Sequence, residues 1–324
     1  MKAILCTRLG GADDLELADI PEPIPGFGEA VVTVKATALN FFDTLIIAGR
    51  YQIKPSLPFS PGAEFSGIVE RVAADVTAVK PGDRVVGNMG FGAARERVVV
   101  RAERLVRLPD NLDFERAAGL TVIYGTGYYA LKNCAGLKPG ETLAVLGAAG
   151  GTGLAAVELG KTMGARVIAC ASSSDKLAFA RQHGADEGVN YVEQDLKEAL
   201  RAVSGGRGID VVYDPVGGPL AEPALRAIAW DGRFLVVGFA AGEIPRMPLN
   251  LVLLKNCQLL GVHWGAWVER DPQGHRANMA ELLHWCSEGR ISAHVHAIYP
   301  LDRTADALKE LAHRQVMGKV LIRP

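Results

Sequence analysis

The sequence predicts an α/β protein in which a doubly wound parallel sheet of six strands follows a smaller β region, and three observations support this. A short apolar strand at 142–147 runs into a turn of very small residues and then into a helical pattern. Strand-like and helical segments alternate from there to residue 262, as in a parallel sheet covered by helices. Up to about residue 110, short strand-like runs alternate with Gly/Pro turns instead, which indicates a small barrel.

These patterns place the elements in order along the chain. The N-terminal β region includes strand-like runs at 30–36, 65–73, 83–87 and 97–101. Helical patterns follow at 114–120 and 125–131. The six strands of the parallel sheet are predicted at 142–147, 165–171, 186–190, 209–214, 233–238 and 257–262. The tail holds a helix near 274–287, a strand near 295–299, a helix near 302–312 and a strand near 318–322, and we expect it to fold back onto the first domain.

Bulk properties limit the class of protein. At 324 residues the chain is too long for one core, so two domains are expected. A formal net charge of -1 and a pI near 6.7 give no attraction to nucleic acid or to an anionic membrane. No apolar run suits a signal peptide or a bilayer span, so we expect a soluble, cytoplasmic protein. The five cysteines are scattered without a Cys-x-x-Cys pair, which argues against a disulfide framework or a zinc ribbon.

The small-residue turn is a candidate dinucleotide site. Gly147 allows a sharp turn after the strand, Gly150 allows backbone to approach a pyrophosphate, and Gly153 allows the helix to pack closely on the sheet. The N–H groups of the helix N-terminus face the phosphate. The predicted binding set is Gly147, Ala148, Ala149, Gly150, Gly151, Thr152 and Gly153. A tight strand-helix turn without a ligand is the alternative.

The end of the second strand indicates which dinucleotide is bound. An NAD-binding sheet normally has an acidic residue there, which accepts bonds from the ribose 2′-hydroxyl. This chain has Ser172 and Ser173 followed by Lys176, which suit a 2′-phosphate. NADPH is therefore the predicted cofactor. In the alternative interpretation, Ser174 caps the next helix and Lys176 is a solvated surface residue.

Over almost its whole length the chain resembles the zinc-free quinone oxidoreductases of the medium-chain dehydrogenase/reductase superfamily. The segments that carry the resemblance are ALNFFD (38–43) with GRY (49–51), PGAEFSG (61–67), VKPGDRV (79–85), the glycine turn, DPVGG (214–218) and GKVL (318–321). The resemblance implies a GroES-like β domain formed by residues 1–123 and 264–324. It also implies a Rossmann domain at 124–263, with the active site in the cleft between the two.

The resemblance assigns further cofactor and cleft residues. It puts Lys176, Tyr191 and Arg314 around the adenosine 2′-phosphate, and it puts Asn40 and Phe239 on opposite sides of the nicotinamide and substrate. From the residues alone, the alternative for Tyr191 is an aromatic packed at the strand edge. The alternative for Arg314 is an exposed cation near a helix end.

The resemblance also bears on metal binding. Zinc-dependent relatives have a histidine in a Gly-His-Glu sequence, and this chain has Ala63 at that place. It also lacks the four closely spaced cysteines of a structural zinc site. Since a catalytic zinc needs three protein ligands, no metal site is predicted. We expect Glu64 to be a buried, hydrogen-bonded structural residue.

Hydride transfer to a quinone or an α,β-unsaturated carbonyl is the predicted reaction. Asn40 and Tyr51 are the candidates for donating hydrogen bonds to the developing oxyanion, and Tyr51 is also a candidate proton donor. Asp43 is expected to satisfy backbone N–H groups beneath the site. Tyr51 is otherwise an aromatic of the cleft wall, and Trp264 and Trp267 either line the substrate cavity or pack in the core.

Two other functions and one assembly are compatible with the sequence. An enoyl thioester such as an enoyl-CoA is an alternative substrate, with Arg50 and Lys54 available to its phosphates. A non-catalytic NADPH-binding or RNA-binding protein is the second alternative, although the neutral charge disfavours RNA.

The apolar stretch 249–256 adjoins the predicted edge strand 257–262, and the resemblance implies a homodimer joined there. A small helix packed on its own subunit is the other possibility for this stretch.

Overall fold

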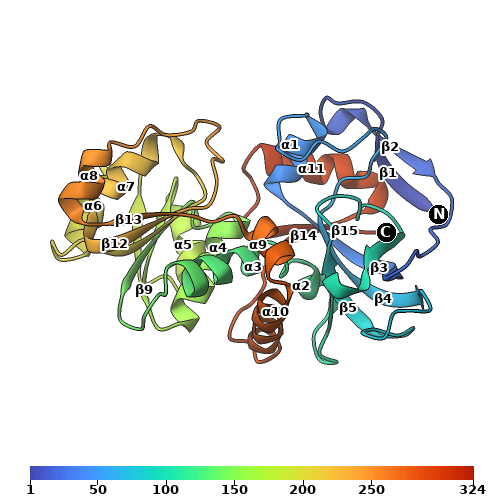
Figure 1. Ribbon diagram of the computed structural model, residues 1–324. Helices are drawn as coiled ribbons and strands as arrows, with labels where there is room; N and C mark the ends of the chain where they lie inside the picture. The colour runs from blue at the N-terminus through green and yellow to red at the C-terminus, as the bar shows by residue number, and fades with distance from the viewer. The chain divides into compact units, whose positions relative to one another are not determined.

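The computed structural model describes residues 1–324, which divide into two units. The first unit consists of Met1–Val122 and Asp271–Pro324, and the second of Ile123–Arg270. An antiparallel sheet dominates the first unit, and a parallel sheet forms the centre of the second (Figure 1).

The sheet of the second unit has six parallel strands in the order β10-β9-β8-β11-β12-β13. Their bounds are β8 Thr142–Leu146, β9 Arg166–Ala171, β10 Glu187–Asn190, β11 Ile209–Asp214, β12 Ile228–Val236 and β13 Gln258–Gly261. The chain begins in the middle with β8, builds outward to β10 and then returns to β11. This is the doubly wound arrangement that the alternating pattern predicted, so the predicted fold class is confirmed.

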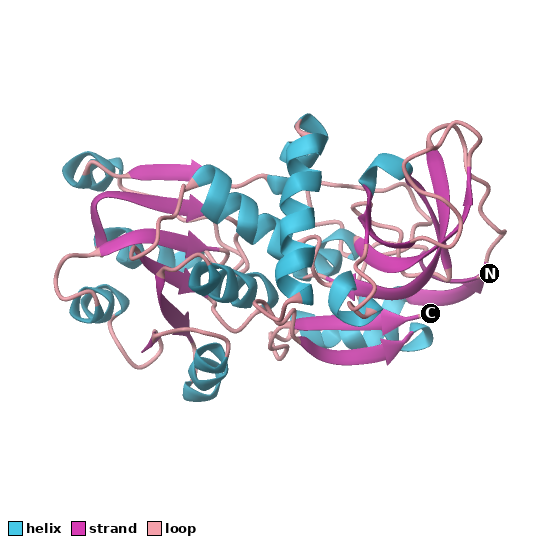
Figure 2. Cartoon of the chain, turned by 90° about the horizontal axis from the view of Figure 1, so that it is seen from below, coloured by secondary structure: helices cyan, strands magenta, loops and turns pink.

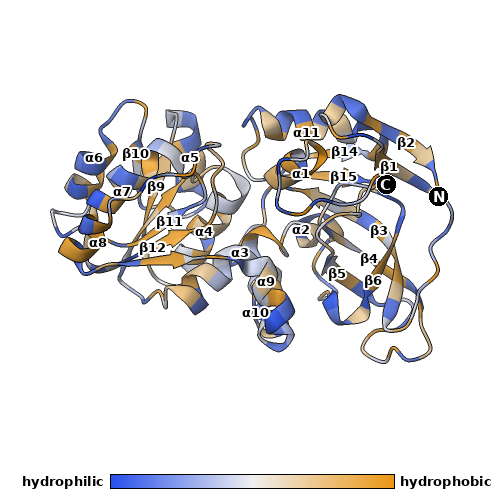
Figure 3. Ribbon diagram, turned by 45° about the horizontal axis from the view of Figure 1, so that its top comes forward, coloured by the Kyte–Doolittle hydropathy of each residue, from blue (hydrophilic) through white to orange (hydrophobic).

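The central strands of this sheet are apolar because both of their faces are covered. Every residue of β8 is buried, and the helices lie on both sides of the strands (Figure 2). The strands are mostly hydrophobic, whereas α6 exposes a polar face (Figure 3). The helices of this unit are α3 Ile123–Tyr128, α4 Gly151–Thr162, α5 Ser174–Gln182, α6 Leu196–Val203, α7 Ala221–Arg226, α8 Leu249–Lys255 and α9 Trp264–Arg270, with a π-helical turn at Tyr129–Cys134 after α3.

The main sheet of the first unit has the order β14-β15-β3-β4-β5-β7, and β6 also pairs with β3. The strands are β3 Glu29–Leu39, β4 Glu64–Val72, β5 Arg84–Asn88, β6 Arg97–Arg101, β7 Leu105–Arg107, β14 Val295–Pro300 and β15 Lys319–Arg323. A separate pair is formed by β1 Lys2–Cys6 and β2 Leu15–Asp19. The helices are α1 Phe41–Ile47, α2 Phe114–Ala118, α10 Pro272–Ser287 and α11 Thr304–Ala312.

The long strand β3 organises the first unit because it pairs with β4, β6 and β15. Its pairing with β15 is antiparallel and aligns Leu39 with Val320, while its pairing with β4 aligns Ala38 with Glu64. The C-terminal strand therefore ends up beside the point where β3 meets α1. Three segments that are far apart in the sequence converge there.

The structure refines the predicted elements in several places. β12 begins at Ile228, five residues before the predicted start, because Ile228 already pairs with Ile209 of β11 ahead of the turn at Asp231 (φ 60°). The β1–β2 pair, β7 and α1 were not predicted. Residues 249–255 form the short helix α8, which ends at Asn256 in the left-handed conformation (φ 48°). None of the helices combines the length and the hydrophobicity that crossing a bilayer requires.

Candidate active site

The glycine turn joins β8 to α4, and two of its glycines are required by the fold itself. Gly147 has a φ of 63°, which disfavours other residues. A Cβ at Gly153 would lie 2.2 Å from the carbonyl oxygen of Gly147, so only glycine allows the helix to approach the strand. At Gly150 a Cβ would meet only that same oxygen, at an ordinary 3.5 Å. The exposed Gly150 is thus not needed for internal packing, and the space outside it is open.

The other residues of the turn divide into buried and outward-facing ones. Ala148 and Ala149 are buried, and the Ala148 N–H donates to the Cys170 carbonyl of β9 at 3.1 Å, which ties the turn to the next strand. Gly150 is the N-cap of α4, and Gly151 and Thr152 begin its first turn. Backbone N–H groups in the first turn of a helix have no partner within the helix and favour anions.

The hydroxyl and lysine residues predicted for the 2′-phosphate lie together after β9. Ser173 is the N-cap of α5, and its Oγ accepts a hydrogen bond from the Lys176 backbone N–H at 3.4 Å. The Lys176 ammonium donates to the Ser172 Oγ, also at 3.4 Å. The alternative in which Ser174 caps the helix was wrong, because Ser174 is already the first helical residue.

Tyr191 lies beside this group in the second unit, and Arg314 belongs to the first. The Tyr191 N–H donates to the Ala171 carbonyl at 3.1 Å, which places Tyr191 at the end of β10 next to Ser172. Its ring also packs in part against the hydrophobic core of the second unit, as the alternative reading expected. Arg314 is exposed, follows α11 and has a φ of 58°. Its role at the phosphate remains a prediction.

Phe239 follows β12 and is 39% exposed. Its loop packs on the Asp214–Gly218 turn after β11, where a Cβ at Gly217 would lie 2.8 Å from the Phe239 ring. The Asp214 Oδ1 accepts from the N–H groups of Val216 and Gly217, both at 2.8 Å, and burial raises the pKa of Asp214. The buried carboxyl thereby fixes the turn on which the Phe239 loop rests.

In the first unit, Asn40 directly follows β3 and is the N-cap of α1. Its backbone N–H donates to the Asp43 Oδ2 at 2.7 Å, and the Gly62 N–H donates to the Asp43 Oδ1 at 3.0 Å. This confirms the expected role of Asp43 in satisfying backbone N–H groups. Burial raises the pKa of Asp43 to about 7, although the two N–H groups and the nearby Lys319 charge oppose the shift.

The Asn40 side chain belongs to a buried polar network with Glu64 and Lys319. The Asn40 Nδ2 donates to the Glu64 Oε1 at 3.0 Å, and the Lys319 ammonium donates to the Asn40 Oδ1 at 2.5 Å. Lys319 also lies 2.7 Å from the Glu64 Oε1, and the Val122 N–H donates to the Glu64 Oε2 at 2.7 Å. Glu64 is fully buried and hydrogen-bonded, as predicted. Sequence reasoning missed Lys319, although the GKVL motif contains it.

Tyr51 follows α1 and is half-buried. Its ring stacks on Phe42 with the centroids 5.4 Å apart, and it packs against the hydrophobic core of the first unit. Burial raises the pKa of the Tyr51 hydroxyl, and the nearby Asp43 charge adds to the shift. The hydroxyl therefore stays protonated at neutral pH and is a hydrogen-bond donor.

The two tryptophans lie on α9 of the second unit. Trp264 is buried and packs on α3, where a Cβ at Gly125 would lie 3.0 Å from its ring. Trp267 stacks on Tyr129 with the centroids 4.4 Å apart. These two rings contribute to a cavity of about 210 Å³, whose full lining is Tyr129, Gly261, His263, Ala266, Trp267 and Arg270. Trp264 is thus a core residue, and Trp267 is accessible from this cavity.

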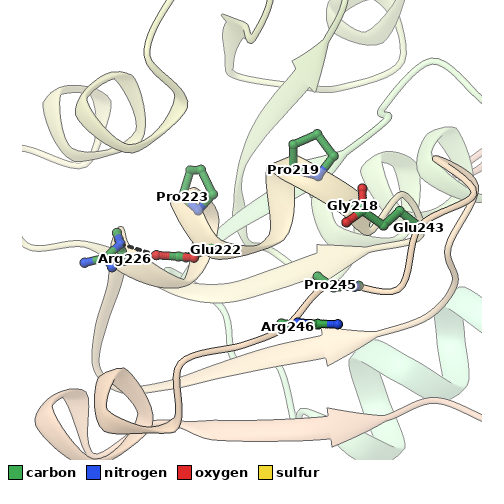
Figure 4. A pocket seen from close by; sticks show the side chains of 8 residues that line it. All are labelled: Gly218, Pro219, Glu222, Pro223, Arg226, Glu243, Pro245 and Arg246. Atoms are coloured by element: carbon green, nitrogen blue, oxygen red, sulfur yellow. Dashed lines mark hydrogen bonds and ion pairs between the residues drawn. The ribbon is translucent and has the colours of Figure 1, made fainter.

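A larger cavity of about 340 Å³ lies between α7 and the segment that follows the Phe239 loop (Figure 4). It is lined by Gly218, Pro219, Glu222, Pro223, Arg226, Glu243, Pro245 and Arg246. Arg226 and Glu222 in its wall form an ion pair at 2.6 Å. None of the predicted site residues lines this cavity. Nowhere in the chain do three or more His, Cys, Asp or Glu side chains gather in a group suited to a metal ion.

Comparison with known proteins places this architecture in a family. A model of the alcohol dehydrogenase GroES-like domain matches residues 26–110, and a model of the zinc-binding dehydrogenases matches residues 151–288. Quinone oxidoreductase-like protein 2 of Rattus norvegicus is 41% identical over 99% of the chain and 91% of its own length. A quinone oxidoreductase of Pseudomonas aeruginosa is 34% identical over 100% of the chain and 99% of its own length.

The solved structures agree with this assignment. The Escherichia coli quinone oxidoreductase, crystallised in complex with NADPH, superposes with a TM-score of 0.93 at 30% identity and covers 100% of both chains. The predicted GroES-like and Rossmann architecture is thereby confirmed. The chain belongs to the quinone oxidoreductase family of the medium-chain dehydrogenase/reductase superfamily.

Proposed function

We propose that this oxidoreductase uses NADPH and transfers a hydride to a quinone or an α,β-unsaturated carbonyl. The observation that carries the proposal is the group Ser172, Ser173 and Lys176 at the end of β9. That place normally holds an acidic residue in NAD-binding sheets, and here it offers hydroxyl donors and an ammonium group. The NADPH complex of the Escherichia coli relative supports the same choice.

The residues of the second unit fit such a cofactor. The turn from Gly147 to Gly153 is free of side chains on its outer side at Gly150, and the first N–H groups of α4 are suited to a pyrophosphate. Lys176 and Ser172 would hold the 2′-phosphate, with Tyr191 beside them. The bound nicotinamide supplies the hydride. Phe239, on its braced loop, belongs to the same proposed cofactor set, and Arg314 of the first unit is the remaining residue proposed for it.

Asn40 and Tyr51 are the groups we propose for the acceptor. Hydride addition to a conjugated carbonyl puts negative charge on the carbonyl oxygen, which fixed hydrogen-bond donors stabilise. Tyr51 keeps its proton at neutral pH, since the ordinary pKa of a tyrosine already lies well above 7 and burial raises the pKa of Tyr51 further. Asn40 uses one amide N–H on Glu64 and retains a second, since a primary amide has two.

We also propose that the reaction is independent of zinc. The family model that matches residues 151–288 describes zinc-binding dehydrogenases, but the residues here do not fit a catalytic zinc, which takes three protein ligands. Ala63 carries no donor atom, and Glu64 is already engaged by Lys319, Asn40 and a backbone N–H. Elemental analysis should find no stoichiometric zinc, and a chelator should leave turnover unchanged. Loss of activity on chelation that zinc restores would contradict the proposal.

The direct test is a screen of NADPH oxidation against quinones, alkenals and enoyl-CoA thioesters, with NADH as the comparison. We expect turnover with quinones or alkenals and a preference for NADPH. A single-turnover measurement of hydride transfer separates a catalyst from a protein that only binds nucleotide. Tight NADPH binding without oxidation by any of these acceptors would refute the enzymatic proposal, and a strong preference for enoyl-CoA would reassign the substrate.

We further propose a homodimer joined at the edge of the parallel sheet. β13 is the outer strand of that sheet, and the adjoining helix α8 exposes Leu249, Leu253 and Leu254 at 72%, 79% and 66%. Apolar side chains this exposed beside an open strand edge are typical of an interface. Sedimentation should give a dimer, and Leu253→Glu should shift it toward the monomer. A monomeric wild type would refute the assembly.

A further inference from the structure

The first unit contains a buried ion pair between Lys319 and Glu64. The Lys319 side chain is 4% exposed and that of Glu64 is fully buried. Both are hydrogen-bonded, Lys319 to the Asn40 Oδ1 and Glu64 to the Val122 N–H. Removing two charges from water is costly, and an apolar pair of similar volume is often as stable. Stability alone therefore does not account for this pair.

Chemistry fixes how the Asn40 amide lies between the two charges. An ammonium can only donate, so Lys319 must face the Asn40 Oδ1, and a carboxylate can only accept, so Glu64 must face the Asn40 Nδ2. The sheet register supplies the positions, since β15 pairs with β3 directly before Asn40 and β4 begins at Glu64. The amide is clamped at both ends, and one N–H of its Nδ2 remains for another acceptor.

We propose that Lys319 is a positioning residue that acts through Asn40, orienting its amide and polarising it so that the second N–H becomes a stronger donor to the acceptor's carbonyl oxygen. The inference rests on the proposed function above. A positive charge on the amide oxygen draws electron density from the amide nitrogen, and hydrogen bonds in a chain strengthen one another in a low dielectric. The network thereby delivers part of a positive charge to the developing oxyanion through protein groups.

The test removes both charges together so that neither is left buried and unpaired. Lys319→Gln/Glu64→Gln keeps polar side chains at both places and abolishes the ammonium. We expect kcat for a quinone or alkenal to fall about 10- to 100-fold, as for loss of a charge-assisted hydrogen bond in the transition state. KM and the NADPH dissociation constant should stay within about twofold of wild type. An unchanged kcat would overturn the proposal.

A cycle with Asn40→Ala distinguishes positioning from general support of the fold. If Lys319 acts through Asn40, adding the two Gln substitutions to Asn40→Ala costs no further activity. Losses that multiply, or a fall in kcat that parallels a fall in thermal stability, would overturn the proposal. Lys2→Met is the matched control in the same unit, because Lys2 pairs with Asp19 at the exposed surface at 2.7 Å. It should leave kcat unchanged.

Lys319→Met alone keeps the inference testable if the double variant does not fold. It removes the ammonium, while Glu64 keeps its hydrogen bonds from the Asn40 side chain and the Val122 N–H, so kcat should again fall about tenfold or more with NADPH binding unchanged. A smaller fall in kcat would overturn the role of the lysine charge. A wild type that binds NADPH but reduces no acceptor defeats the proposed function instead, and the two failures are therefore distinguishable.

Discussion

Replacing Lys176 by alanine is the sharpest test of the cofactor assignment. The substitution removes the ammonium that lies 3.4 Å from the Ser172 Oγ. It leaves the cap of α5 intact, since Ser173 bonds the backbone N–H of residue 176 and not its side chain. Protein stability should therefore hardly change. Any loss of binding would report contact with the nucleotide.

The expected size follows from the exposure of the site. A hydrogen bond to a charged group contributes about 1.5 to 3 kcal/mol, and screening at a partly exposed position reduces this to about 1 to 2 kcal/mol. The NADPH dissociation constant should rise about 5- to 30-fold, while that for NADH should change less than about twofold. Fluorescence titration with both nucleotides measures this, and added salt should reduce the difference.

Two controls sharpen the experiment. Lys197→Ala removes another partly exposed lysine of the second unit, which pairs with Glu198, and it should leave both affinities unchanged. An equal loss for NADPH and NADH in Lys176→Ala would refute a contact with the 2′-phosphate, and it would return Lys176 to the role of a solvated surface residue.

Three further perturbations test the remaining assignments. Gly153→Ala places a Cβ 2.2 Å from the Gly147 carbonyl oxygen and should lower the free energy of unfolding by about 1 to 3 kcal/mol in a urea titration. Gly150→Ala should leave the free energy of unfolding unchanged and weaken NADPH binding. Equal free energies of unfolding for the two variants would contradict the packing argument. Tyr51→Phe should lower turnover on enoyl thioesters and alkenals more than on one-electron quinone acceptors, and unchanged turnover on all of them would reduce Tyr51 to a packing role. Because the pKa of Asp43 rises from 3.8 to about 7 on folding, the folded state holds a proton that the unfolded chain releases between those two pH values. The contribution of Asp43 to the free energy of unfolding therefore falls by about 1.4 kcal/mol per pH unit in that range and is lost above it. Comparing the pH dependence of unfolding with that of Asp43→Asn isolates this slope, and identical curves would refute the shift.

Much of the fold was predictable because local patterns determine it. The β8 strand with its glycine turn and the strand-helix alternation predicted a doubly wound parallel sheet of six strands, which the structure has. The elements that escaped prediction are short or depend on distant partners. α1 spans only 41–47 and is fixed by the buried Asp43, and β1 and β2 are stabilised by pairing with each other.

In the candidate site too, the residues that are close in sequence were predictable and those brought together from distant segments were not. Ser172, Ser173 and Lys176 stand within five residues of one another, so their convergence was visible in the sequence. Lys319 lies 279 residues after Asn40, and only the antiparallel pairing of β15 with β3 brings them together. No local pattern encodes such a contact, although a lysine directly before the apolar run 320–322 was a usable signal.

The division of the first unit between the two ends of the chain affects how the protein is made on the ribosome. The contiguous segment Ile123–Arg270 can acquire its fold while translation continues, but the end of β3 waits for β15, which is synthesised only after that whole segment. Until then Thr37, Ala38 and Leu39 keep one edge unpaired, and such an open edge favours premature association of nascent chains. A deletion of residues 319–323 would consequently do more than shorten the protein, because it would leave this end of β3 permanently without its partner strand.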